Sequence, residues 1–220
     1  MNRKAVSHLR RVDPVMAGVI ERVGPCRYRV NDGGSHFDAV VRSIVYQQLS
    51  GSAASTIHSR LLALYGGAAP DPVRLLETAD EALRGVGLSR QKISYLRDLA
   101  ARVESGEVPM QSIHELDDDA VIETLSRIKG VGRWTAQMFL MFRLGRPDVL
   151  PELDLGVRKA IQLAYRTRAL PSIERVHKIG ARWAPYRTIA SWYLWASLDM
   201  KEAKPVPRQS SPMPGKARTK

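Results

Sequence analysis

Apolar residues recur at intervals of three and four along most of the chain, and this spacing predicts a protein built from helices. Residues 90–103 show it most plainly, because Ile93, Leu96 and Leu99 fall on one face of a 3.6-residue repeat. Start and stop signals bound the other segments, as where Asp13 precedes a proline and an apolar run. The predicted helices cover residues 14–23, 35–49, 53–65, 73–76, 80–85, 90–103, 119–128, 134–144, 156–165, 173–183 and 185–198.

Few segments depart from this helical pattern. A short strand is expected at residues 27–30, and residues 147–151 are expected to be extended. From residue 204 onward, prolines, serines and basic residues follow one another without periodicity, which predicts a disordered basic tail at 204–220. The sequence therefore predicts one all-α domain over residues 1–203, followed by that tail.

The net charge of +12 suggests a polyanionic partner, but the ends of the chain carry most of it. Residues 1–11 hold four basic residues and no acid, and residues 201–220 hold a net charge of +5. Only +3 is left for the rest of the chain. Solvated basic tails at both ends explain the charge as well as a nucleic-acid partner does, so the argument for function has to come from the core.

The composition excludes several classes of protein. A single cysteine, Cys26, rules out an internal disulfide and any cysteine-held zinc or iron–sulfur cluster within one chain. No stretch approaches the roughly 20 apolar residues that cross a bilayer, and the first residues lack the apolar segment of a secretory signal. We expect a protein of the reducing cytoplasm that uses no cofactor and no metal and does not enter a membrane.

A helical hairpin over residues 119–144 turns on the tripeptide Gly130-Val131-Gly132. Two glycines allow a tight turn and expose consecutive N–H groups at the start of the second helix, where the helix dipole favours an anion such as a DNA phosphate. Val131 is expected to fill the gap between the two helices. The predicted contacts to the DNA backbone are Lys129, Gly130, Gly132, Arg133 and Thr135.

A glycine–apolar–glycine turn alone also fits an ordinary helix end. The chain contains a second copy at residues 85–87. We interpret this copy primarily as an ordinary helix end, although it too could contact a backbone phosphate. The hairpin at 119–144 is distinguished by a second motif on its C-terminal side. About twenty residues later the chain reads Leu150-Pro151-Glu152-Leu153-Asp154-Leu155-Gly156.

The pairing of Ile-Lys-Gly-Val-Gly-Arg-Trp-Thr-Ala with Pro-x-x-Asp-Leu-Gly resembles the helix-hairpin-helix DNA glycosylase superfamily, most closely the AlkA-type 3-methyladenine DNA glycosylases. The resemblance covers roughly residues 35–200 and implies two helical lobes flanking an active-site cleft. The larger AlkA-type enzymes carry an additional N-terminal α/β domain, which we do not expect in this compact chain.

By this resemblance Asp154 is the catalytic aspartate. A carboxylate beside the sugar stabilises positive charge at C1′ or helps a water molecule attack it. Asp154 also fits an N-cap for the helix at 156–165, and the two roles are compatible because a cap fixes the orientation of its side chain. Glu152 is the nearest competing carboxylate but falls off the motif position.

Position 134 separates two kinds of reaction. Members of the superfamily that cleave the strand place there a lysine that forms a Schiff base with C1′. This chain has Trp134, and Lys129 is not a substitute by position, so hydrolysis that leaves an abasic site is predicted.

The resemblance also implies residues that extrude and hold the damaged base, because the bond to be cut is inaccessible inside a duplex. The predicted wedge that fills the vacated space is Gln48, Leu49 and Ser50, with either Leu49 or Ser50 at its tip. Trp134, Trp195 and Tyr46 are predicted to line the base pocket, where electron-rich rings attract a cationic alkylated base. Met138 stands where the better-known AlkA type has an aromatic residue, which leaves the range of bases open.

We therefore expect a monomeric, monofunctional glycosylase that removes alkylated bases, such as 3-methyladenine and 7-methylguanine, from double-stranded DNA of a bacterial nucleoid. Three alternatives remain open: a strand-cleaving relative, a relative that acts on other base lesions, and a non-catalytic DNA-binding protein that uses the hairpin only as an anchor.

Overall fold

The computed structural model describes residues 2–202, which contain helices and no strand. The expected tail at 204–220 lies outside the described residues. No helix among them is long and apolar enough to cross a membrane. The elements are α1 (Asn2–Val12), α2 (Pro14–Val23), α3 (His36–Tyr46), α4 (Gly51–Leu64), α5 (Pro72–Glu77), α6 (Asp80–Gly85), α7 (Arg90–Glu104), η1 (Ile113–Glu115), α8 (Asp118–Ser126), α9 (Arg133–Phe142), α10 (Leu155–Ala164), α11 (Ile173–Gly180), η2 (Ala181–Trp183) and α12 (Arg187–Glu202).

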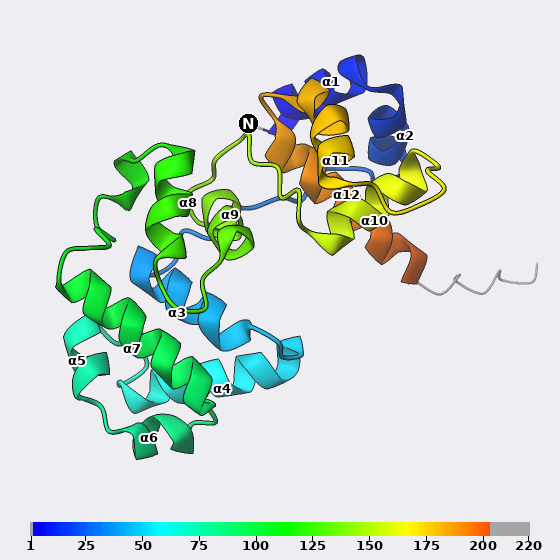
Figure 1. The fold of residues 1–220 in the computed structure, drawn as a ribbon. Coiled ribbons are helices and arrows are strands. Elements are labelled where there is room, and N and C mark those ends of the chain that lie inside the picture. Colours follow the sequence, from blue (N-terminus) through cyan, green and yellow to red (C-terminus); the bar gives the residue numbers. More distant parts are fainter. Residues whose placement is uncertain (1, 203–220) are drawn as a thin grey trace, which may run out of the picture.

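The helices form two lobes, each with its own apolar core (Figure 1). The first lobe is built from α3 to α9, and the second combines α1 and α2 with α10, α11 and α12. The chain thus begins in the second lobe, crosses to the first and returns. The all-α, two-lobed architecture predicted from the sequence is confirmed.

The predicted helix starts carry the expected caps. At α3, the Ser35 hydroxyl accepts a hydrogen bond from the Asp38 N–H at 3.1 Å, and the Asp38 carboxylate accepts one from the Ser35 N–H at 2.8 Å. At α2, the Asp13 carboxylate accepts from the backbone N–H groups of Val15 and Met16. These bonds satisfy N–H groups that the first turn of a helix leaves without partners.

The expectation of a basic N-terminal tail is wrong, because residues 2–12 form helix α1. Ala5 and Leu9, four residues apart, are both fully buried in the core of the second lobe. Arg10 and Arg11 lie in the last turn of α1, where positive charge complements the helix dipole. Two apolar residues were too weak a pattern to predict a helix that depends on its packing partners.

The strand expected at residues 27–30 is also absent. This segment crosses from the second lobe to the first in an extended form, and the Tyr28 hydroxyl donates to the carbonyl of Met141 at the end of α9. One backbone bond follows, from the Asn31 N–H to the Phe142 carbonyl at 2.8 Å. Because the partner is a helix end rather than a strand, no ladder forms.

The two lobes share a packed junction. Phe142 of α9 and Trp195 of α12 each contact both cores, with their ring centroids 6.0 Å apart. The segment that leads from α9 back to the second lobe is held by an ion pair. In it the Arg187 guanidinium of α12 donates twice to the Asp148 carboxylate, at 2.8 and 2.9 Å. These contacts fix how the helices of one lobe face those of the other, and the candidate site lies across this junction.

Candidate active site

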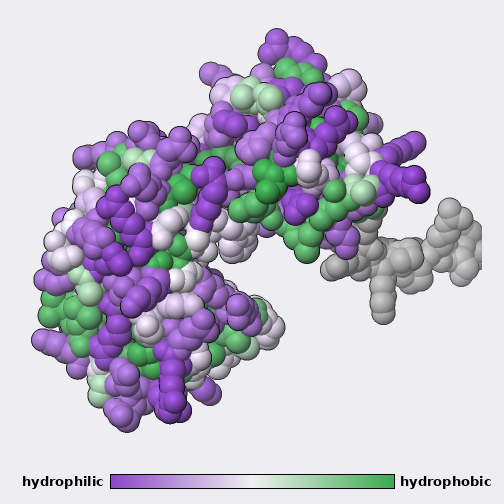
Figure 2. Space-filling view, in the orientation of Figure 1, coloured by the Kyte–Doolittle hydropathy of each residue, from purple (hydrophilic) through white to green (hydrophobic). Residues whose placement is uncertain are grey.

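Asp154 caps helix α10 at the start of the second lobe. Its Oδ1 accepts a hydrogen bond from the backbone N–H of Val157 at 2.7 Å, so the capping role predicted from the sequence is confirmed. Figure 2 shows apolar surface over the start of α10, where Leu153 and Leu155 are exposed on either side of Asp154. The aspartate is half-buried between them.

Two indole N–H groups also donate to this carboxylate. Trp134, in the first turn of α9, donates to Oδ2 at 2.8 Å, and Trp195 of α12 donates to Oδ1 at 2.8 Å. Asp154 therefore accepts hydrogen bonds from three elements of two lobes. Because each donor has a fixed direction, the carboxylate is held in one orientation.

Close packing beside this carboxylate favours a glycine. A Cβ at Gly156 would lie 3.0 Å from the Asp154 Oδ1 and 3.0 Å from the Trp195 Cδ1, closer than such atoms normally approach. The helix that Asp154 caps therefore lacks a side chain at its second position so that the indole of Trp195 can reach the carboxylate.

The competing carboxylate, Glu152, belongs to the support of the hairpin. It is 5% exposed and accepts hydrogen bonds from Arg133 at 2.8 Å and from Gln137 at 2.7 Å. Burial raises the pKa of Glu152, but the bonds from Gln137 and Arg133 outweigh burial, and the pKa lies below its ordinary value. Glu152 thus serves the packing of α9.

The hairpin has the geometry expected from its glycines. Val131 is buried between α8 and α9 as predicted, and Gly130 has a φ of +76°, which favours glycine. Gly132 caps α9 without a side chain, so the first N–H groups of this helix have no side-chain acceptor. Such a helix start attracts an anion.

The predicted phosphate-binding side chains have different environments. Lys129 is exposed, and its ammonium lies 3.8 Å from Asp98, while its backbone N–H donates to that carboxylate at 2.8 Å. Arg133 is half-exposed while paired with Glu152. Thr135 is 8% exposed and lines a cavity on the inner side of α9, and its contact with a phosphate stays a prediction.

The predicted wedge residues lie in a loop, because α3 ends at Tyr46 rather than near residue 49 as expected. Gln48 has a φ of +56°, in a left-handed region that side chains other than glycine rarely adopt, and Leu49 is 39% exposed. Ser50 caps α4 by accepting from the N–H of Ala53. The structure thus exposes Gln48 and Leu49 and uses Ser50 as a cap.

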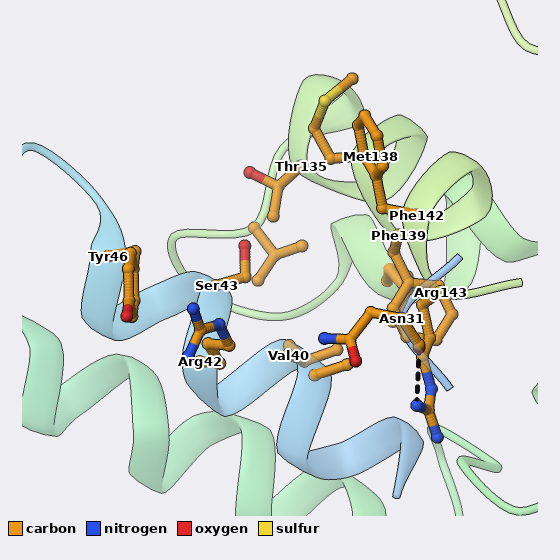
Figure 3. Close-up of a pocket in the computed structure, with 13 residues that line it drawn as sticks. Asn31, Val40, Arg42, Ser43, Tyr46, Thr135, Met138, Phe139, Phe142 and Arg143 are labelled. Carbon is orange, nitrogen blue, oxygen red and sulfur yellow. Dashed lines mark hydrogen bonds between the residues drawn. The ribbon is translucent and has the colours of Figure 1, made fainter. Parts of the chain in front are cut away.

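A cavity of about 260 Å³ lies between α3 and α9, and Figure 3 shows side chains of both helices around it, with Asn31 before α3 and Arg143 after α9. It continues into a groove of about 830 Å³ that reaches the wedge loop and α7. Four residues line both spaces. They are Ser43, Tyr46, Thr135 and Met138.

Two of the three predicted pocket residues, Tyr46 and Trp134, line this space, and Trp195 lines neither the cavity nor the groove. Tyr46 lines it directly, but the guanidinium carbon of Arg42 lies 4.2 Å from the centre of its ring and covers one face. Trp134 is 43% exposed in the groove, with its indole N–H directed to Asp154. Trp195 lies behind Phe142, a wall residue of the cavity that the sequence had not singled out.

No cluster of three or more histidine, cysteine, aspartate or glutamate side chains suited to a metal occurs within residues 2–202. The chemistry available at this site is that of an oriented carboxylate whose partner Trp134 lines the groove.

Comparisons with known proteins agree on one family. The family described as "HhH-GPD superfamily base excision DNA repair protein" matches residues 41–185. The chain belongs to the HhH-GPD superfamily. DNA-3-methyladenine glycosylase 1 of Schizosaccharomyces pombe is 34% identical over 209 residues, which cover 92% of this chain and 91% of that protein.

Solved structures of HhH-GPD proteins show the same fold. A crystal structure of DNA-3-methyladenine glycosidase from Bacillus halodurans has a TM-score of 0.80 and 38% identity, covering 90% of this chain and 91% of that one. The Schizosaccharomyces pombe 3-methyladenine DNA glycosylase in complex with abasic DNA has a TM-score of 0.77 and covers 87% of this chain and 95% of that one. The resemblance to the 3-methyladenine DNA glycosylases inferred from the motifs is therefore confirmed.

Proposed function

We propose that the protein is a monofunctional DNA glycosylase of base excision repair that hydrolyses the N-glycosidic bond of alkylated purines in double-stranded DNA, with Asp154 as its catalytic carboxylate. The observation that carries the proposal is the carboxylate itself, held in one orientation by the indoles of Trp134 and Trp195, of which Trp134 also lines the groove. Relatives named as 3-methyladenine DNA glycosylases support the substrate class. We expect it to act on genomic DNA as a monomer.

One oxygen of Asp154 is better placed for the reaction than the other. Oδ1 accepts two hydrogen bonds, from Val157 and Trp195, whereas Oδ2 accepts one, from Trp134. A carboxylate oxygen accepts about two hydrogen bonds, so Oδ2 keeps the capacity to meet the sugar or the attacking water. Trp134, which donates to Oδ2, is also one of the residues that line the groove.

The reaction uses these groups in order. The base is first turned out of the duplex, with exposed Gln48 or Leu49 filling its place. The C1′–N bond then breaks, and its electron pair leaves with the base, which a positive charge has already made a good leaving group. Asp154 stabilises the positive charge on the sugar. A water oxygen bonds to C1′ and passes its proton to Asp154, which returns it to solvent, and an abasic site remains.

The test is release of free base from N-methylated duplex DNA. We expect the wild type to release 3-methyladenine or 7-methylguanine, and Asp154→Asn to lower the single-turnover rate by about 100-fold or more while still binding undamaged DNA. Asp71→Asn makes the same chemical change at the N-cap of α5, far along the chain in the first lobe, and is expected to leave the rate unchanged. Equal rates for wild type and Asp154→Asn would rule out the assignment.

The same samples distinguish hydrolysis from strand cleavage. Because Trp134 occupies the position of the Schiff-base lysine, borohydride is expected to trap no covalent adduct with DNA. A trapped adduct would identify a strand-cleaving enzyme, and DNA binding without release of any base would identify a non-catalytic anchor.

A further inference from the structure

The wedge loop, residues 47–50, is joined to the hairpin by a single side chain. The Gln47 amide donates through Nε2 to the carbonyl of Gly130 at 2.8 Å, across 83 positions of sequence. Gln47 comes directly after the last residue of α3, and Gly130 is the first glycine of the hairpin turn. The bond therefore connects the predicted wedge loop with the predicted phosphate-binding turn.

The loop has few other restraints. Gln48 and Leu49 are exposed, and the backbone of Gln48 is left-handed, a conformation that persists only where the surroundings impose it. At the far end of the loop, Ser50 is held as the cap of α4. Gln47 is the corresponding restraint at the near end.

Helix α7 holds both partners of this bond in place. The Lys92 ammonium donates at 2.6 Å to the carbonyl of Val45 in the last turn of α3. The ring of Tyr95 occupies the space where a side chain at Gly130 would lie, so it packs directly on the turn. Both ends of the Gln47 bond thus lie against the first turns of α7. Gln47, Lys92, Tyr95 and Gly130 all line the 830 Å³ groove.

We propose that Gln47 is a positioning residue that sets the wedge loop at a fixed distance from the phosphate-binding turn, so that binding of the backbone places Gln48 and Leu49 at the base to be extruded. The inference rests on the proposed glycosylase function. The hairpin turn contacts the strand through its N–H groups, and its carbonyl at Gly130 faces the loop. The phosphate contact of the hairpin turn and the inserted wedge residue are then held at a fixed distance from each other.

The test compares Gln47→Met, which keeps the length of the side chain and removes the donor, with Gln111→Met, the same change at an exposed position of the first lobe. Gln111 lines neither the cavity nor the groove. For 7-methylguanine paired with cytosine, we expect Gln47→Met to lower the single-turnover excision rate roughly 5- to 10-fold, the effect of one lost hydrogen bond. Affinity for undamaged duplex should stay within about two-fold.

A second substrate separates positioning of the wedge from a general loss of structure. Opposite an abasic site, extrusion of 7-methylguanine costs less, so the deficit of Gln47→Met should shrink while Gln111→Met remains like the wild type on both substrates. An equal deficit on both substrates, or none on the paired one, would overturn the proposal. If Gln47→Met does not fold, Gln47→Glu replaces it, since that change also removes the donor at neutral pH.

Failure of the glycosylase proposal is recognised separately, because the wild type would then release no base. Insertion of the loop into DNA is then measured with a duplex that carries 2-aminopurine next to a stable abasic analogue. The fluorescence of 2-aminopurine rises when an inserted residue disrupts its stacking. We expect a smaller rise with Gln47→Met than with the wild type or Gln111→Met. Equal rises in all three would overturn the positioning role.

Discussion

Single residues at the site are arranged so that one carboxylate is held from both lobes. Trp134 and Trp195 each present an N–H to Asp154 and leave the faces of their rings for packing or for the groove. An indole has one hydrogen-bond donor and no acceptor. Neither tryptophan can therefore accept a proton in place of the Asp154 carboxylate. Their positions therefore orient the carboxylate.

Gly156→Ala is expected to separate activity from stability. The new methyl group meets the Asp154–Trp195 pair, so the indole must shift and the excision rate should fall about 10-fold, an effect of the size of one misplaced catalytic contact. The unfolding free energy should not fall with it, since alanine favours a helix over glycine by up to about 1 kcal/mol. Excision assays and urea unfolding of the same protein measure both quantities.

Gly18→Ala is the matched control, because a Cβ at Gly18 in α2 comes no closer than 3.9 Å to the Arg22 guanidinium. It should stabilise the fold by about 0.5–1 kcal/mol and leave excision unchanged. A Gly156→Ala protein with the full excision rate would contradict the role assigned to the close packing.

Much of this residue-scale picture was predictable, and part of it was not. Asp154 follows from its motif and its capping position, and Trp134 from its place in the hairpin. The bond between Trp195 and Asp154 was not predictable, because spacing along the chain does not tell which way a side chain on α12 points. Neither was the inward position of Thr135, since the first turn of α9 has both an outer and an inner side.

Whole elements depend on a few buried polar groups, of which Asp13 is the clearest. It is fully buried, caps α2, and accepts hydrogen bonds from Trp183 at 2.9 Å and from the Tyr165 hydroxyl. Burial and the bond to Asp13 raise the pKa of Tyr165 above its ordinary value. One carboxylate therefore joins α2 to α10 and η2.

Asp13→Ala should lower the unfolding free energy by about 3–5 kcal/mol. The change removes a helix cap, worth about 1 kcal/mol, and leaves two buried donors without partners, each costing about 1–3 kcal/mol. Ser35→Ala removes only an exposed cap and should cost about 1 kcal/mol. Urea unfolding measures both, and similar losses would show that the buried network contributes little.

Elements with a strong apolar stripe were predicted well, whereas those that depend on distant partners were not. The helix over Arg90–Glu104 matches its pattern almost to the residue. Helix α1 was missed because its apolar face consists of Ala5 and Leu9 and acquires its stability from α2 and α12. The end of α3 was placed too late because an apolar residue, Leu49, comes after the turn and is exposed in the loop.

The whole molecule presents its candidate DNA contacts from the first lobe and its carboxylate from the second. The hairpin and the wedge loop belong to the first lobe, and Asp154 opens α10 in the second (Figure 1). Binding of the DNA backbone should therefore depend on charge in the first lobe, while the reaction depends on the junction between the lobes.

Lys129→Ala should reduce the slope of log K against log salt for undamaged duplex by about 1, because each phosphate contact releases about one counterion. Lys178→Ala removes the same charge from an exposed position on α11 in the second lobe and should leave the slope unchanged. Titrations at several salt concentrations measure the slope. Equal changes for both variants would show that total charge matters and the hairpin does not.

The path of the chain through the two lobes sets an order for its synthesis. The ribosome releases α1 and α2 first, yet their core partners Trp183 and Tyr193 are made near the end. The first lobe, from α3 to α9, is complete well before that and has a core of its own. A nascent chain that has reached the end of α9 thus carries one complete lobe and two helices, α1 and α2, without their packing partners. Until α12 is made, the apolar faces of these two helices are exposed and can be bound by chaperones.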